Sequence, residues 1–208
     1  PGATNTVTLI YVGPGETTTR AIYLTGSSGT RRLEASGSGA LVITNLINNT
    51  ANSNTPNGSA STKTLELRGV NTDFNMITST LTNELSGGNG ALTVSKGVSS
   101  NGWGQDSAAW LFTGVNTFTG NFNLSSGAIF VGAGSNLGTG VLYGGSTNAS
   151  LSTYNADITL LNSSLQAGNG QFAFTGAYNI GFANPVQLIN GAFILGNTVA
   201  PGKAVTFS

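Results

Sequence analysis

The side chains that could do chemistry in this 208-residue chain are few: seven carboxylates, seven Lys or Arg residues and two Trp residues. The chain has no His and no Cys, so it lacks the usual general base near neutral pH, the thiolate nucleophile and the commonest metal ligands. Enzymes that cleave polysaccharides need two carboxylates that act together, or a carboxylate set that holds a metal ion. The carboxylates here are scattered along the chain: Glu16, Glu34, Glu66, Asp73, Glu84, Asp106 and Asp157.

This scatter favours solubilising charge over catalysis. Even the two closest carboxylates, Glu66 and Asp73, are seven positions apart. The sequence therefore predicts no catalytic residue, no cofactor and no metal site. A polysaccharide-acting enzyme stays as the weakest of three functional hypotheses, because stacked turns of the chain could still bring two distant carboxylates together.

The best candidate for contact with a ligand is Trp103, with Asp106 beside it. Trp103 lies in a Gly-rich stretch, residues 97–109, where an exposed aromatic ring could stack on a sugar or on a protein partner. A host or matrix glycan or protein is the partner that this pair predicts; simple packing of Trp103 is the alternative. Trp110 follows in a strand-like stretch, and we expect it in the core at the position that Leu65 and Phe172 occupy in similar phrases.

Composition narrows the class of protein further. Charged residues make up 7% of the chain and the net charge is zero, against about 25% charged residues in an ordinary globular domain. Nothing here attracts nucleic acid or an anionic lipid surface, and no apolar stretch approaches the ~20 residues of a membrane span. The surface is polar without being charged, rich in Asn, Thr, Ser and Gly.

The strand signals are short and numerous, whereas helix signals are almost absent. Gly interrupts nearly every window long enough for a helix, and the one segment with helical apolar spacing, residues 71–85, is so rich in Thr and Asn that a strand or loop is favoured. Residues 48–62 and 97–109 are predicted surface loops of one domain, 1–208. The clearest predicted strands are residues 6–12, 40–44, 64–67, 91–94, 128–131 and 192–195.

Two short phrases recur along the chain. One is Gly-Ala followed by alternating apolar residues, beginning at Gly39, Gly90, Gly127 and Gly191. The other is apolar-x-apolar-x-Gly, ending at Gly26, Gly69, Gly114 and Gly176, with irregular intervals of 43, 45 and 62 residues. Irregular spacing is typical of a solenoid whose loops vary in length.

We therefore predict an all-β protein, a right-handed parallel β-helix (β-solenoid), with an antiparallel β-sandwich as the alternative. In a β-helix, coils of about 20 residues would give roughly ten turns. Inward apolar columns would form the core, and aligned Asn residues would bond to one another along the stack, as in cross-β ladders.

One stretch, residues 112–138, carries a more specific pattern. Its residues are Phe112, Gly114, Asn116, Thr117, Phe118, Thr119 and Gly120, then Gly127, Ile129, Val131 and Gly132, and finally Ser135, Asn136, Leu137 and Gly138. This pattern resembles the autotransporter-associated β-strand repeat, found in passenger regions of bacterial autotransporters and related exported surface proteins. Weaker echoes lie at residues 65–72 and 191–196.

The resemblance implies a structural repeat with no catalytic residue. The leading hypothesis is a non-enzymatic structural or adhesive stalk segment of a bacterial surface-exposed or secreted protein. The second is a self-assembling subunit of an extracellular fibre or matrix, because an uncapped solenoid exposes pairing edges at both ends and can associate end to end.

Overall fold

The computed structural model describes residues 6–26, 28–48, 62–83, 90–97, 106–145, 149–167, 171–187 and 192–207. Within these ranges the chain forms β-strands and no helix, as the composition predicts. Each of the six clearest predicted strands coincides with an observed strand or lies largely within one. Part of the ambiguous segment 71–85 forms the short strand Asn75–Ile77, because its buried positions alternate as in a strand.

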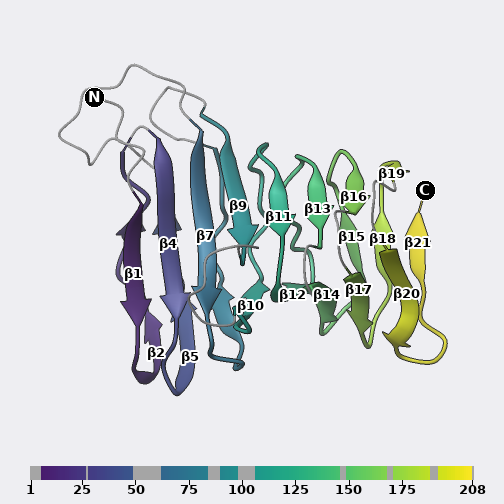
Figure 1. Ribbon diagram of the computed structural model, residues 1–208, viewed down its shortest axis with the longest axis horizontal. Helices are drawn as coiled ribbons and strands as arrows, with labels where there is room; N and C mark the ends of the chain where they lie inside the picture. The colour runs from purple at the N-terminus through teal and green to yellow at the C-terminus, as the bar shows by residue number, and fades with distance from the viewer. Residues whose placement is uncertain are drawn as a thin grey trace.

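Most strands belong to two eight-stranded sheets, between which the chain alternates. The first sheet contains β1 (Val7–Tyr11), β4 (Gly29–Ala35), β7 (Lys63–Gly69), β9 (Leu92–Lys96), β11 (Phe122–Leu124), β13 (Leu142–Gly144), β16 (Leu165–Ala167) and β19 (Val186–Gln187). The second contains β2 (Pro14–Thr18), β5 (Gly39–Ile43), β8 (Asn75–Ile77), β10 (Ala109–Phe112), β12 (Gly127–Gly132), β14 (Ala149–Tyr154), β17 (Gln171–Gly176) and β20 (Ala192–Val199). Figure 1 shows the first sheet running along the long axis from β1 to β19.

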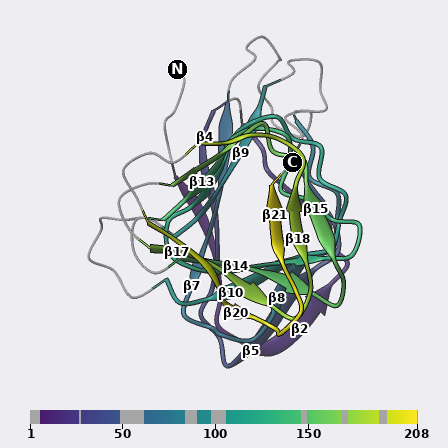
Figure 2. The same cartoon turned by 90° about the vertical axis from the view of Figure 1, so that its right-hand side faces the viewer.

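Two smaller sheets complete the structure. A three-stranded sheet is formed by β15 (Ile158–Leu160), β18 (Ile180–Phe182) and β21 (Val205–Phe207), and a two-stranded sheet by β3 (Ile22–Tyr23) and β6 (Leu46–Ile47). Seen along the long axis, the two large sheets and the three-stranded sheet lie on different sides of a common interior (Figure 2).

We call one course of the chain around the stack, from a strand to its paired strand further along the sequence, a passage. Among the described residues every strand pairs in parallel with a strand from a neighbouring passage, as in β4 with β7 or β12 with β14. This arrangement fits a β-helix-like fold. The alternative of an antiparallel β-sandwich is wrong for the described strands, because a sandwich of that kind is built from antiparallel neighbours.

The register gives the length of each passage. Phe122 pairs with Leu142, 20 positions further on, whereas Arg31 pairs with Leu65, 34 positions further on. The longer passage contains residues 49–61, which lie outside the described residues. The expectation of roughly ten turns is too high for the described part of the chain, where each large sheet holds eight strands and several passages exceed 20 residues.

The core consists largely of columns of inward side chains from successive strands. In the second sheet, Ile43, Ile77, Phe112 and Val131 follow one another in register, and all four are fully buried. Each such side chain contributes roughly 1.5–3 kcal/mol of hydrophobic stabilisation when it is removed from water. The core is thus distributed along the stack.

The repeated phrases do not mark equivalent positions in the fold. Trp110 is fully buried, as predicted, and pairs with Asn75 and Ile129 in the second sheet. Leu65 lies in the first sheet, and the residue in register with Trp110 on β17 is Phe174 rather than Phe172. The expected equivalence of Trp110 with Leu65 and Phe172 is therefore wrong. Leu65 belongs to the other sheet, and Phe172 lies in the same sheet as Trp110 but two positions earlier in the register.

Buried Asn side chains join successive passages at the turns. Asn75 accepts a hydrogen bond from the Leu41 amide of the preceding passage and donates to the Ala109 carbonyl of the next, both at 3.0 Å. Asn116 does the same between the Leu81 amide and the Asn136 carbonyl. The predicted stacking role of Asn is thus present in altered form: these side chains bond to the backbone of neighbouring passages, whose groups would otherwise be buried without a partner.

Replacing Asn75 by Ala tests this bridging. The change leaves the Leu41 amide and the Ala109 carbonyl without their side-chain partner, so we expect the free energy of unfolding to fall by about 2–3 kcal/mol in urea denaturation. The control is Asn123→Ala, since the half-buried Asn123 side chain makes a single 3.3 Å hydrogen bond with Ser95. Equal effects of the two substitutions would contradict the bridging role.

Candidate functional site

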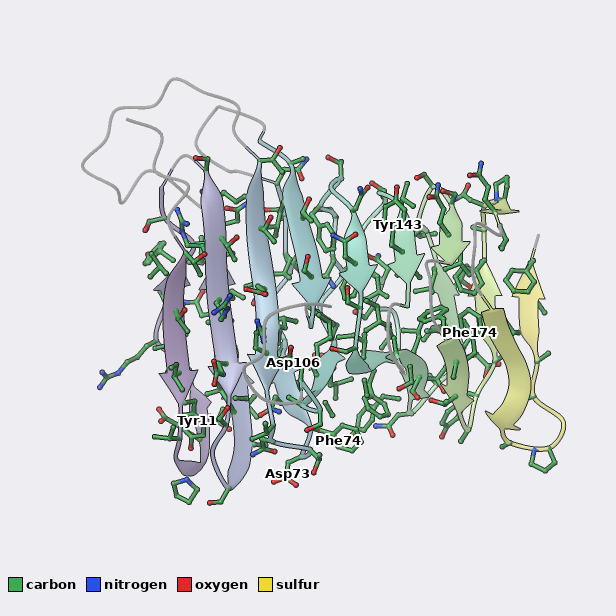
Figure 3. All side chains as sticks on the ribbon, in the orientation of Figure 1. Tyr11, Asp73, Phe74, Asp106, Tyr143 and Phe174 are labelled. Atoms are coloured by element: carbon green, nitrogen blue, oxygen red, sulfur yellow. The ribbon has the colours of Figure 1, made fainter. Side chains whose placement is uncertain are left out.

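The predicted ligand contact, Trp103 with Asp106, is only partly within the described structure. Trp103 lies outside the described residues. Asp106 lies shortly before β10, and its side chain is only 8% exposed (Figure 3). Its Oδ1 atom accepts a hydrogen bond from the Arg68 Nε atom at 2.7 Å, so this carboxylate is engaged by the protein itself.

Arg68 belongs to a chain of ion pairs over the first sheet. Its Nη1 atom lies 3.4 Å from the Glu66 Oε1 atom, and the Glu66 Oε2 atom lies 2.7 Å from the Arg32 Nε atom. Arg32 and Glu66 are direct neighbours across β4 and β7. Two carboxylates that are 40 positions apart in sequence, Glu66 and Asp106, thus meet at one arginine. Because both carboxylates are paired with Arg68, these ion pairs suit the anchoring of the segment around Asp106 to strand β7.

The backbone of Asp106 is held from the other side by Lys96. Lys96 is fully buried at the end of β9, in register with Leu67, and its ammonium group donates to the carbonyl oxygens of Asp106 at 3.0 Å and Ser126 at 3.2 Å. Burial lowers the pKa of Lys96 to about 8; the Asp106 carboxylate opposes this shift and the Arg68 cation adds to it. Asp106 is therefore fixed by both its side chain and its carbonyl.

The residues of the repeat-like stretch lie where passages of the chain come closest. A Cβ at Gly114 would overlap the carbonyl oxygen of Ser79, and one at Gly120 would overlap that of Leu92. Gly127 has a φ of 73° and begins β12 against the Asp106 carbonyl. The others either bond to a neighbouring passage or fill the core: Asn116, Thr117, Phe118, Ile129 and Val131.

These placements explain why the stretch needs Gly, Asn and apolar residues at these positions. These residues allow neighbouring passages of the chain to stack closely, and their side chains do not converge on a reactive centre. Among the described residues no group of three His, Cys, Asp or Glu is close enough to hold a metal ion. The described part of the chain also contains no helix long and apolar enough to cross a membrane.

A cluster of three aromatic rings lies on the outside of the second sheet and is not predicted from the sequence. Phe74, from the turn before β8, packs against Phe130 of β12 and Tyr154 of β14, with ring centroids 4.8 and 5.3 Å away and in edge-to-face geometry. Phe74 is 42% exposed. Only the register of the sheet brings these rings together, because 56 and 24 positions separate them in sequence.

Comparisons with known proteins relate part of the chain to a curated protein. No family model matches the chain, and no solved structure matches it. The adhesin BmaC autotransporter of Brucella suis biovar 1 (strain 1330) is 33% identical over 135 residues, which is 65% of this chain and 3% of that protein. The chain is thus related in sequence to part of an autotransporter adhesin and spans a small fraction of its length.

The lowered pKa of Lys96 predicts a pH-dependent stability. Between pH 8 and the ordinary pKa of 10.5, the unfolded chain keeps a proton on Lys96 that the folded chain has lost. Because the unfolded state then binds more protons, the free energy of unfolding rises with pH through this window. The resulting increase in the free energy of unfolding is on the order of 3 kcal/mol.

The variant Lys96→Met isolates this effect. This variant lacks the two hydrogen bonds of Lys96 at every pH. Its free energy of unfolding should also lack the increase with pH that Lys96 contributes. The measurement is urea denaturation of both proteins at pH 7.5 and pH 10, where contributions from the other titrating groups are shared. A constant difference in stability between the two proteins across this window would contradict the prediction.

Proposed function

We propose that this chain is a non-enzymatic structural and adhesive segment of a bacterial surface-exposed or secreted protein. The observation that carries the proposal is the 135-residue similarity to a protein named as an autotransporter adhesin. The scattered carboxylates, and the pairing of Glu66 and Asp106 with one arginine, agree with a role without catalysis. The proposed location is the extracellular space or the bacterial cell surface.

The architecture proposed for this role is one domain, residues 1–208, wound as a right-handed parallel β-helix that forms a stiff stalk. Parallel pairing between successive passages and continuous core columns support it. A stack of strands about 4.8 Å apart resists bending, because every added strand is hydrogen-bonded along its length to the one before. We assign residues 112–138 to an autotransporter-associated β-strand repeat within this stack.

The adhesive part of the proposal concerns the predicted surface loops at residues 48–62 and 97–109. Asp106 would act by fixing the second loop at its C-terminal end, through Arg68 and Lys96, rather than by touching a ligand. Trp103 would supply the contact with a host or matrix glycan or protein. A loop with an anchored end loses less conformational entropy on binding than a free one.

Adhesion can be measured with beads coated with the purified chain and placed on epithelial cells or on deposited extracellular matrix. We expect the coated beads to be retained several-fold more than albumin-coated beads. Trp103→Ala should reduce retention and Trp103→Phe should preserve most of it, because stacking needs an aromatic face. Val115→Ala, at an exposed position outside residues 97–109, is the control. Retention no higher than with albumin would contradict the adhesive function.

A second candidate function, assembly into an extracellular fibre, is favoured by the N-terminal edge of the first sheet. In β1, the side chains of Val7, Leu9 and Ile10 are exposed, although Leu9 is in register with the buried Leu33 of β4. The side of β1 that faces away from β4 has no paired strand among the described residues. An uncovered apolar edge of this kind is a template for a further strand.

Sedimentation velocity tests this candidate. If chains associate through β1, the sedimentation coefficient should rise with protein concentration, and Leu9→Lys should abolish the rise by placing a charge on the edge. Leu161→Lys is the matched control, since Leu161 is 46% exposed and Leu9 is 47% exposed. A sedimentation coefficient independent of concentration for the unsubstituted chain would exclude assembly at those concentrations.

A further inference from the structure

The outer face of the second sheet carries an apolar stripe. By strand alternation, the residues between the inward core positions face outward, and in register these are Val42, Met76, Leu111 and Phe130. The next two outward positions are polar, Ser152 and Thr175. Within this stripe Leu111 is fully buried, and Val42, Met76 and Phe130 are half-buried. The protein itself therefore already covers part of the stripe.

The exposed ring of Phe74 is held rigidly beside this stripe. It lies in a turn between two buried asparagines, Asn71 and Asn75. The Asn71 Oδ1 atom accepts from the Asp73 amide at 2.7 Å, and its Nδ2 atom donates to the Gly37 and Gly39 carbonyls of the preceding passage. Asn75 donates its side-chain amide to the Asp73 carbonyl. The turn therefore cannot swing Phe74 away without breaking these hydrogen bonds.

The ring itself is fixed as well as its backbone. Its interplanar angles are 89° with Phe130 and 65° with Tyr154, so it packs edge to face against two neighbours that are only half-buried. Edge-to-face pairs of this kind are worth about 0.5–1.5 kcal/mol each beyond their burial. A large exposed ring that is preorganised by its neighbours can bind a ligand without first being ordered.

We propose that Phe74, Phe130 and Tyr154 form a binding platform for a neutral pyranose ring of a glycan. The proposal rests on the adhesive function proposed above and gives it a second contact surface. The apolar C–H face of the sugar would stack on the Phe74 ring, and sugar hydroxyls would donate to the exposed Asp73 carboxylate next to it in the turn. Figure 3 shows Asp73 and Phe74 together at the edge of the molecule.

Size favours a sugar over a folded protein. A stable protein–protein interface buries about 800 Å² on each partner, whereas this cluster offers one ring that is 42% exposed and two that are half-buried. Such a platform matches a single sugar ring. Several such contacts along an extended glycan or surface would then combine by avidity.

Charge favours a neutral sugar over an anionic one. Asp73 is exposed beside the platform, and no Lys or Arg lies within the turn at residues 70–77 or in the facing strands β12 and β14. A sulfated or sialylated glycan would meet an acidic group without a compensating cation. A neutral sugar would have its hydroxyls matched by a carboxylate acceptor.

The test is saturation-transfer NMR with the whole chain and defined oligosaccharides. The neutral probes are chitotriose, mannotriose and N-acetyllactosamine, and the anionic probes are 3′-sialyllactose and a heparin tetrasaccharide. We expect saturation transfer to the ring protons of at least one neutral probe and weaker transfer to the anionic probes. Phe74→Ala should lower the affinity by about tenfold, Phe74→Tyr should retain it, and Asp73→Asn should weaken it less.

The matched control is Phe207→Ala, since Phe207 is 43% exposed but lies on β21 and stacks on Phe182. Thermal denaturation of each variant verifies that it is folded. Absence of transfer to every neutral probe, a preference for the anionic probes, or equal binding by Phe74→Ala and the unsubstituted chain would each overturn the proposal.

The bead assay separates this proposal from the adhesive function. If the unsubstituted chain adheres and Phe74→Ala adheres equally well, the function stands and the platform is not its site. If the chain does not adhere at all, the adhesive function fails while the NMR result still decides whether the platform binds sugar.

Discussion

The interaction on which the structure depends is the parallel, in-register pairing of each passage of the chain with the next. Once Arg31 lies opposite Leu65 and Phe122 opposite Leu142, strand alternation decides which side chains face the interior. A shift by one residue would turn Ile77 and Phe112 outward and place Met76 and Leu111 in the core. The fully buried columns therefore define the register as much as the backbone hydrogen bonds do.

Close stacking imposes a polar constraint at the turns, where strand pairing ends. The backbone groups there are buried but have no strand partner, and the chain satisfies them with amide and ammonium side chains. Asn75 and Asn116 bridge neighbouring passages, and Lys96 binds two carbonyl oxygens inside the stack. This explains why a nearly uncharged chain buries two of its few lysines, Lys63 and Lys96: each supplies several donors at a place that water cannot reach.

The same stacking builds surfaces from residues that are far apart in sequence. Arg68 joins Glu66 to Asp106 on one side of the stack, whereas Phe74 meets Phe130 and Tyr154 on another. The ion pairs of Arg68 hold the segment around Asp106 in place, whereas the ring of Phe74 remains exposed to solvent. The adhesive role and the sugar platform proposed above both depend on surfaces made in this way.

The sequence alone determined the strand content and the burial of Trp110, because alternation, Gly-marked turns and the scarcity of helix formers are local properties. It favoured parallel over antiparallel pairing but did not decide between them. It did not determine the register: similar phrases around Leu65 and Trp110 enter different sheets, and passage lengths vary from 20 residues to more than 30. Only the tertiary structure could therefore bring Asp106 to Arg68 or set Phe74 against Tyr154. These contacts depend on which passages become neighbours, and loop lengths between strands decide that without leaving a periodic signal in the sequence.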